Sequence, residues 1–157
     1  MGSRLVVHNN SPKWKGDWTA NGVTKIQLDV FNPNAFELTM RLGIAGPGDF
    51  GKSSRGNKYV TSTGIVVPAH GHWHTILFDV TAADLAQISG TDADDALTGV
   101  TQFRVIHNSA LDWRGVAVAG TFLLDNISAI PEPATATLGL GSLAMALLTR
   151  RQRRHLV

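Results

Sequence analysis

The chain contains no cysteine and very little glutamate, and both absences limit its chemistry. Without cysteine, disulfide bonds and cysteine-ligated zinc or iron sites are excluded. Glu37 is the only glutamate among residues 1–130, whereas glycoside hydrolysis needs two carboxyl groups facing each other across a cleft. The aspartates in "TDADD" indicate a solvated loop, and no serine nucleophile elbow or phosphate-cradling glycine loop is present in the sequence. We therefore expect that the protein is not an enzyme.

The positive charge of the chain is confined to its end. Residues 1–130 contain ten Lys and Arg residues against eleven Asp and Glu residues, so the formal net charge of +2 comes from the arginines near the carboxyl terminus. A body without a basic excess gives no argument for binding nucleic acid. We expect no nucleic-acid partner.

Residues 1–130 contain short apolar segments separated by turn residues. In "VTKIQLDVF" and "FELTMRLGIA" apolar and polar residues alternate, the period of two that predicts a strand with one face on a core. The connecting "NPNA" holds turn-forming residues, so we expect these two strands to form an antiparallel pair. Four further segments are rich in β-branched and aromatic residues: "YVTSTGIVVP", "WHTILFDV", "VTQFRVIHN" and "VAVAGTFLLDNISAI".

One segment, "TAADLAQI", favours a helix of about two turns. Thr81 is a suitable N-cap residue, Asp84 follows three positions later, and Leu85 and Ile88 form a short apolar edge. Otherwise, many short strands without long alternating helices predict an all-β fold. We expect residues 1–130 to form an antiparallel β-sandwich of jelly-roll, galactose-binding-like type.

Three tryptophans are candidate sugar contacts. Trp14 and Trp18 flank "KGD", and Trp113 lies between Asp112 and Arg114 in "SALDWRG". The face of an indole ring packs against the C–H bonds of a pyranose, and the neighbouring charged side chains can hydrogen-bond hydroxyl groups. The alternative is that each tryptophan closes one end of the sandwich as part of its structure.

The segment "HGHWH" raises the question of a metal site. His70, His72 and His74 recur with period two, so on a strand their imidazoles would share a face and could ligate a divalent ion. The neighbouring proline and glycine favour the alternative, in which the histidines lie on a solvent-exposed turn. Trp73, at the start of a strand, is expected in the core.

The polar pair Asp125 and Asn126 interrupts the apolar run "LLDNI". Both residues offer hard oxygen ligands, so Asp125 is a candidate ligand of a structural Ca²⁺, the one cofactor considered. The alternative is a bulge or a turn at the end of a strand.

The last 27 residues differ from everything before them. Residues 134–149 are uncharged and would extend about 24 Å as a helix, somewhat short of the bilayer core of about 30 Å. Arginine side chains extend the effective span and would keep their end of the helix cytoplasmic. The run has no polar face, which argues against the alternative of a core helix followed by a basic tail. In front of it stand Pro131, Glu132 and Pro133, and behind it stand Arg150, Arg151, Arg153 and Arg154.

This order, a Pro-Glu-Pro motif, a short transmembrane helix and a terminal arginine cluster, resembles a PEP-CTERM sorting signal. The resemblance implies a Gram-negative bacterium, export, and recognition of Pro131, Glu132 and Pro133 by an exosortase, with the four arginines as the cytoplasmic stop. It divides the chain into an ectodomain, 1–130, and a sorting signal, 131–157. It also implies an inner-membrane intermediate, followed by the outer membrane, the cell surface or an exopolysaccharide-rich biofilm matrix.

The body resembles the carbohydrate-binding-like β-domains that often precede such signals, on the residues "SRLVVHNNSPKWKGDWTANGV", "WHTILFDV", "VTQFRVIH" and "LLDNISAI". Such proteins carry an amino-terminal signal peptide, whereas "MGSRLVVHNN" lacks an apolar run of roughly 7–15 residues. We expect that the sequence begins late, which would leave an unpaired sheet edge. The sequence thus predicts a non-catalytic surface or matrix protein that binds exopolysaccharide. The alternatives are a structural matrix protein with no ligand and a glycan-acting enzyme.

Overall fold

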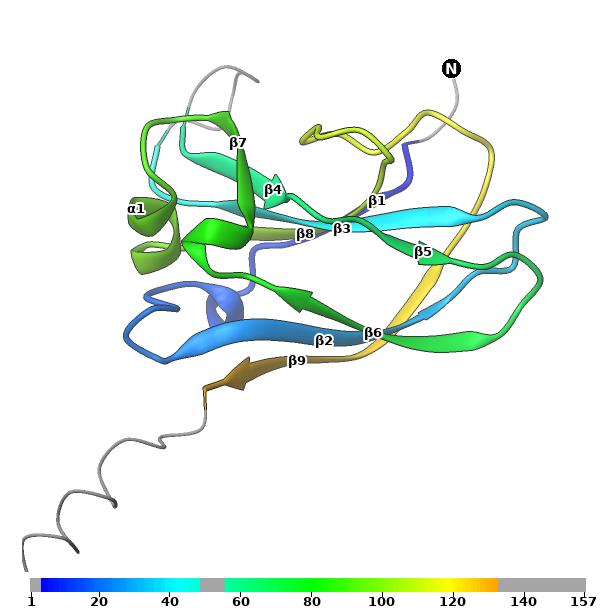
Figure 1. Cartoon of the computed structure of the whole chain (residues 1–157), viewed down its shortest axis with the longest axis horizontal. Helices are drawn as coiled ribbons and strands as arrows, with labels where there is room; N and C mark the ends of the chain where they lie inside the picture. The colour runs from blue at the N-terminus through cyan, green and yellow to red at the C-terminus, as the bar shows by residue number, and fades with distance from the viewer. Residues whose placement is uncertain (1–3, 49–55, 133–157) are drawn as a thin grey trace, which may run out of the picture.

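The computed structural model describes residues 4–48 and 56–132, which fold into two antiparallel sheets lying face to face (Figure 1). The expectation of an all-β antiparallel sandwich is therefore confirmed. In chain order the elements are β1 (Val6–Asn9), η1 (Pro12–Trp14), β2 (Val23–Phe31), β3 (Leu38–Ala45), β4 (Lys58–Thr61), β5 (Ile65–Val67), β6 (Trp73–Asp79), η2 (Ala82–Asp84), β7 (Leu85–Ser89), α1 (Ala93–Thr98), β8 (Gln102–His107) and β9 (Leu123–Pro131). The transmembrane helix expected at 134–149 lies outside the described residues.

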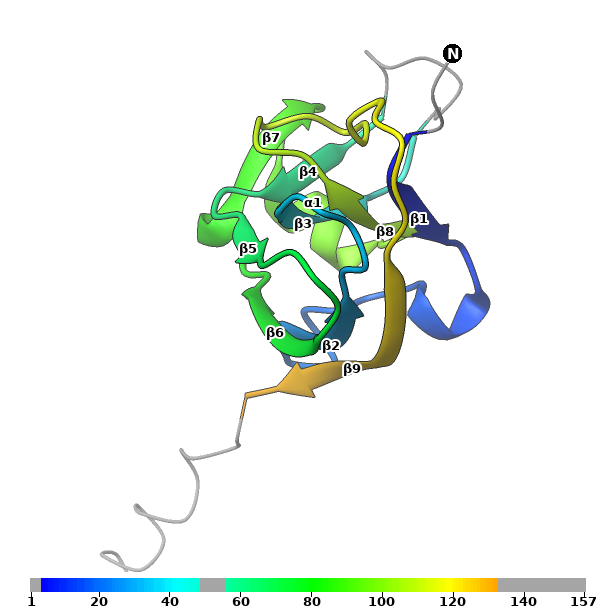
Figure 2. The same cartoon turned by 90° about the vertical axis from the view of Figure 1, so that its right-hand side faces the viewer.

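The two sheets differ in width. The larger has the order β1-β8-β3-β4-β7, with β5 pairing to β3 beyond the end of β4, which makes it six-stranded. The smaller is three-stranded, with β2 between β6 and β9. Figure 2 shows the two layers from the end of the sandwich, with β9 at the edge of the smaller sheet below β1 and β8.

The alternation in the sequence determines which side chains enter the core. Ile26, Leu28 and Val30 of β2 are fully buried, as are the alternating apolar residues of β3, Leu38, Met40, Leu42 and Ile44. These rows point toward each other and form the main core between the sheets. Their burial removes apolar surface from water, which is the main stabilising contribution in a fold of this kind.

The prediction that β2 and β3 form an antiparallel pair is wrong. They belong to different sheets, β2 pairing with β6 and β9 and β3 pairing with β4, β5 and β8. The connection crosses from one sheet to the other around Asn32, which is fully buried. Its side-chain amide donates to the carbonyl oxygens of Phe36 and Pro68, both at 2.9 Å, and its oxygen accepts from the backbone N–H of Asn34 at 3.0 Å. A period of two is the same in a hairpin and in such a crossing, so the pattern alone does not separate them.

The helix predicted from Thr81 to Ile88 is also wrong. Only Ala82–Asp84 is helical, as a single 3₁₀ turn, and the chain continues directly as β7. The Asp84 carboxylate does accept hydrogen bonds from the backbone N–H and hydroxyl of Thr81. However, β7 pairs with β4, with Leu85 opposite Thr61, and this long-range pairing outweighs the local preference for helix.

The aspartate run expected to be a loop instead begins a helix. The Asp92 carboxylate accepts from the backbone N–H of Asp94 at 2.9 Å, as an N-cap does, and Asp94 and Asp95 lie in the first turn of α1. Negative side chains are favoured there, because the first N–H groups of a helix lack partners. The aspartates therefore stabilise a helix end at one end of the sandwich (Figure 1).

Candidate functional site

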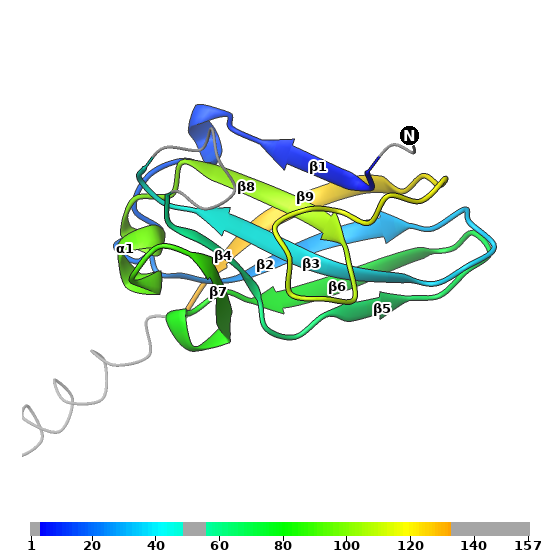
Figure 3. The same ribbon diagram turned by 90° about the horizontal axis from the view of Figure 1, so that it is seen from above.

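The loop from Asn108 to Ala117, here called the cap loop, lies across the outer face of the six-stranded sheet (Figure 3). It carries Trp113, which is only 6% exposed and packs against Val60 and Ile106 in a second core cluster. The Arg104 guanidinium carbon lies 4.3 Å from the centroid of the Trp113 ring. This indole is therefore a structural part of the sheet's outer covering and has no open face for a sugar.

Both neighbours of Trp113 take part in hydrogen bonds within the same loop, Asp112 through its carboxylate and Arg114 through its backbone. The Asp112 carboxylate accepts from the backbone N–H of Arg114 at 3.0 Å. The Asn108 side-chain amide donates to the Arg114 carbonyl oxygen at 2.8 Å. These bonds shape the cap loop through the Asp112 carboxylate and the Arg114 backbone, whereas the Arg114 side chain is exposed.

The other two tryptophans that were predicted to contact sugar, Trp14 and Trp18, lie at one edge of the sandwich. Trp18 is 5% exposed and belongs to the main core, and its indole N–H donates to the carbonyl oxygen of Trp14 at 3.2 Å. Trp14 is partly buried and stacks on the buried Phe103, with ring centroids 5.4 Å apart. Of the three predicted tryptophans, only Trp14 retains partial access to solvent.

The prediction that Trp73 lies in the core is wrong, because half of its surface is exposed. The neighbouring residues of β6 explain this. Ile76 and Phe78 are buried, so the alternation turns the odd-numbered residues of the strand to the outer face. The pattern of "WHTILFDV" contained this information, since Trp73 and the buried Phe78 are five positions apart and so point to opposite faces of a strand.

Strand pairing brings the outer residues of the three-stranded sheet into rows. In the first row, Phe31 of β2 lies between Trp73 of β6 and Leu123 of β9. The Phe31 and Trp73 ring centroids are 5.5 Å apart, and Leu123 is 48% exposed. We call this outer face, with its rows, the aromatic face. No described segment lies over it in Figure 1 or Figure 2.

The second row of the aromatic face is polar and closely connected. Asp29 is opposite Thr75 on one side and Asp125 on the other. One carboxylate oxygen of Asp29 accepts from the Thr75 hydroxyl at 2.6 Å, and the other accepts from the Asn126 side-chain amide at 2.7 Å. These hydrogen bonds hold the pKa of Asp29 below its ordinary value, and the bond from Thr75 has the larger effect. The row therefore keeps a fixed negative charge beside the aromatic pair.

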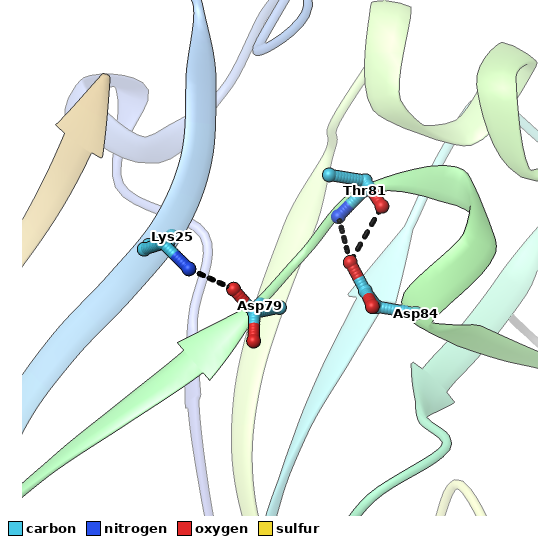
Figure 4. Close-up of polar contacts among 4 residues, drawn as sticks. All are labelled: Lys25, Asp79, Thr81 and Asp84. Carbon is cyan, nitrogen blue, oxygen red and sulfur yellow. Dashed lines mark hydrogen bonds and ion pairs between the residues drawn. The ribbon is translucent and has the colours of Figure 1, made fainter. Parts of the chain in front are cut away.

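Two further rows complete the face. Gln27 is opposite Leu77, which is 45% exposed. Beyond them, the Lys25 ammonium forms an ion pair with Asp79, shown with the Thr81–Asp84 contact in Figure 4. This partner raises the pKa of Lys25. The face thus changes from aromatic to charged along the strands.

The region around Asp125 contains the bulge that the sequence left open as one reading. The pairing of β9 with β2 shifts between Asp29 and Gln27, and Asn126 has a φ of 48° there. One oxygen of Asp125 accepts from the Asn126 backbone N–H at 2.8 Å, and both oxygens of Asp29 have protein donors. Ca²⁺ takes 6–8 oxygen ligands as a rule, at about 2.4 Å, and the described residues contain no group of three or more His, Cys, Asp or Glu that could hold a metal ion. The structure thus shows the bulge, and a calcium ion at Asp125 stays a prediction.

The three histidines of "HGHWH" do not converge either. His70 lies in the turn before β6 with a φ of 70°, and its backbone N–H donates to the Asn34 carbonyl oxygen at 3.1 Å. His72 is exposed and His74 lies on β6 opposite Val30. Within the described chain the three form no metal-binding group.

The sorting motif begins inside the last strand. Pro131 is the final residue of β9 and is opposite Val23, and the Glu132 backbone N–H donates to the Gly22 carbonyl oxygen at 2.9 Å. Pro133 and the cluster Arg150, Arg151, Arg153 and Arg154 lie outside the described residues. In the ranges 4–48 and 56–132, no helix has the length and apolarity needed to cross a membrane.

Comparisons with known proteins bear on the fold. No protein-family model and no curated protein matches the chain. Among solved structures, the chain is similar to a family 11 carbohydrate-binding module from Clostridium thermocellum, solved in complex with a β-1,3-1,4-mixed-linked tetrasaccharide. The similarity has a TM-score of 0.50 at 19% sequence identity and covers 83% of this chain and 72% of that chain. At this identity the likeness shows the fold alone, a carbohydrate-binding-module-like jelly-roll sandwich.

Proposed function

We propose that this domain binds an uncharged polysaccharide on its aromatic face and does not modify it. The observation that carries the proposal is the half-exposed Trp73 beside Phe31 on a sheet face that no described segment covers. Of the six large apolar side chains exposed in the described residues, three lie on this face: Trp73, Leu77 and Leu123. Apolar side chains gathered on one open face are typical of an interaction site.

The first two rows of the aromatic face supply the contacts that a sugar chain needs. The Trp73 indole offers its face to the C–H side of a pyranose ring. The row that contains Asp29 lies two residues further along the strands, a separation of about 7 Å. The carboxylate oxygens of this row have lone pairs left to accept hydrogen bonds from sugar hydroxyl groups. Because Asp29 and Asp125 are both negative, the face favours an uncharged chain over an acidic one.

The solved structure with the similar fold supports a sugar as the ligand, since its own name records a bound tetrasaccharide. That protein is named as a binding module, which agrees with a non-catalytic role. The two alternatives make different predictions. A structural matrix protein binds no glycan, and a glycan-acting enzyme releases reducing ends from one.

The test measures retardation of the full-length chain in gels containing β-1,3-1,4-mixed-linked glucan or other uncharged polysaccharides. We expect Trp73→Ala to weaken binding about tenfold or more, because it removes the stacking surface. Leu111→Ala is the matched control, since Leu111 is 52% exposed on the cap loop, away from the aromatic face. Equal retardation of the two variants, or no retardation of the folded wild type by any glycan tested, would contradict the proposal. Release of reducing ends during the assay would favour the enzyme.

The carboxyl-terminal pattern supports a second part of the proposal, which concerns location. The chain is exported, held in the inner membrane by residues 134–149 and processed by an exosortase, before it reaches the outer membrane, the cell surface or the extracellular matrix. The support is the order Pro131-Glu132-Pro133, uncharged run, arginine cluster in the sequence.

The test of location uses the complete gene product with a reporter at its amino terminus, expressed in cells with and without an exosortase. We expect processing to require the enzyme and to be lost when Pro131, Glu132 and Pro133 are all replaced by alanine. Leu111→Ala serves again as the control. A reporter that stays in the soluble cytosol would contradict the proposal.

A further inference from the structure

At one edge of the sandwich, β9 of the smaller sheet faces the segment of η1, which follows β1 of the larger sheet (Figure 2). A groove of about 550 Å³ lies there, and we call it the edge groove. Ala129 shows how open it is. It is opposite the fully buried Ile26 on the inner side of the sheet, yet Ala129 itself is exposed. The groove falls within the size range of ligand sites, about 300–1,000 Å³.

Trp14 forms a rigid wall of the edge groove. Its ring stacks on the buried Phe103 at an interplanar angle of 22°, and Trp18 meets it edge-on at a centroid distance of 6.4 Å. The indole N–H of Trp18 donates a hydrogen bond to the Trp14 carbonyl oxygen. Because these contacts already order the Trp14 side chain, a ligand would not have to immobilise it on binding.

Two lysines flank this wall. Lys13 and Lys15 precede and follow Trp14, both line the groove, and both are exposed. Neither forms an ion pair with another described residue. No aspartate or glutamate lines the groove. Asp17, two residues after Lys15 in the chain, is not among the lining residues, and its carboxylate accepts from the backbone N–H of Ala20 at 2.7 Å. The edge groove is therefore a positively charged site with an aromatic wall.

We propose that the edge groove is a second and separate binding site, for a sugar ring that carries a carboxylate, such as a uronate residue of an acidic polysaccharide. The ring packs on the exposed part of the Trp14 indole, and the carboxylate pairs with the ammonium groups of Lys13 and Lys15. A uronate combines an apolar ring face with one negative charge, and the groove presents both complements within three consecutive residues.

A single-stranded nucleic acid also combines stacking surfaces with negative charge. The sequence disfavours it, because binding along a polyanion needs an extended basic track, and residues 1–130 carry more acidic than basic residues. The two lysines form an isolated pair of charges rather than part of such a track.

The experiment compares polygalacturonate with the fully methyl-esterified polymer, which keeps the ring and removes the charge. Binding of the full-length chain is measured by calorimetry at low and high salt. We expect the acidic polymer to bind about tenfold more tightly than the ester at low salt, and the difference to shrink as salt screens the lysines.

Variants locate the effect. Lys13→Gln with Lys15→Gln should remove the preference for the acidic polymer, whereas Arg114→Gln, which removes an exposed charge outside the groove, should leave it unchanged. Trp14→Leu should weaken binding of both polymers. If Trp14→Leu no longer melts cooperatively, because it has lost the packing against Phe103, the variant with both exposed lysines replaced still tests the proposal. Trp73→Ala should leave polygalacturonate binding unchanged, so this site and the aromatic face succeed or fail separately.

Three results would overturn the proposal. The first is equal affinity of the wild type for the acidic and esterified polymers, or no measurable binding of either. The second is a preference that survives replacement of both lysines. The third is binding of an oligothymidine but not of polygalacturonate, which would assign the groove to nucleic acid.

Discussion

The outer faces of the two sheets carry tryptophans in opposite situations. On the six-stranded sheet Trp113 of the cap loop packs its side chain onto the sheet and is 6% exposed, whereas on the three-stranded sheet Trp73 is 50% exposed. The first is held by Val60, Ile106 and the Arg104 guanidinium, and the second contacts only Phe31 among the described aromatic rings. One indole therefore stabilises the fold, and the other remains available to a ligand.

The cap loop accounts for this difference. Arg41, on the outer side of β3, donates from Nε to the Asn108 carbonyl oxygen and from Nη2 to that of Ser109, both at 3.1 Å, which holds the start of the loop on the sheet. Gly43, on the same side of β3, leaves room for the loop, since a Cβ there would come within 2.9 Å of the Trp113 ring. The smaller sheet has no comparable covering in the described chain, so its outer rows meet solvent (Figure 1).

The largest expected effect comes from removing the buried indole. Trp113→Ala should lower the free energy of unfolding by about 3–5 kcal/mol, because it leaves a cavity beneath the cap loop. Trp73→Ala, the matched change on the other face, should cost much less. Urea denaturation of both variants measures the difference, and equal losses would mean that the two faces do not differ as described.

A smaller loss is expected when the attachment of the cap loop is weakened. Arg41→Met leaves carbonyl oxygens of Thr61, Ser62, Asn108 and Ser109 without their guanidinium donor. The free energy of unfolding should fall by about 1–3 kcal/mol, and amide hydrogen exchange in residues 109–117 should speed up. Exchange that accelerates equally on the aromatic face would contradict a local role for Arg41.

On the aromatic face, the polar row predicts a change in titration rather than a large change in stability. Thr75→Val removes the main cause of the lowered pKa of Asp29, so this pKa should rise toward its ordinary value, and it should rise less in Asn126→Ala. A carboxylate with a depressed pKa contributes stability above its unfolded pKa and loses it as the pH falls through the folded one. Carboxyl-carbon NMR titration measures the shift. An unchanged pKa in both variants would show that this row does not hold the charge.

The smallest effect is expected at the far end of the aromatic face. Lys25 and Asp79 are both exposed, and an ion pair in water gains little because solvent and salt screen it. Lys25→Gln should leave the midpoint of thermal unfolding unchanged within error at physiological salt. A clear drop would show that the pair supports the pairing of β2 with β6.

The sequence predicted the strands better than their partners. The alternation in residues 23–31 and 36–45 located β2 and β3, the second of which begins two residues later than predicted, and their buried rows. It did not show that the chain crosses between sheets at Asn32, because the amide that fixes this crossing bonds to residues as distant as Pro68. For the same reason β7 was mistaken for a helix, since its pairing with β4 lies outside any local window.

The candidate site shows the same limit. Trp14, Trp18 and Trp113 were predicted as sugar contacts and Trp73 as a core residue, yet Trp18 and Trp113 are buried and Trp73 is half-exposed. The alternation of "WHTILFDV" was available in the sequence and predicts that Trp73 points away from Ile76 and Phe78, toward the outer face. Phe31, which completes the aromatic pair, is brought to it only by the register of β2 with β6.

By itself, the sequence determined the segments of strands such as β2 and β3, though not of β7, and which side chains share a face of each strand, because the alternation of the backbone is local and does not depend on neighbours. Only the tertiary structure decided which faces are covered. Burial of a face depends on what packs over it, and here that was settled by the cap loop on one sheet and by the absence of any such described segment on the other.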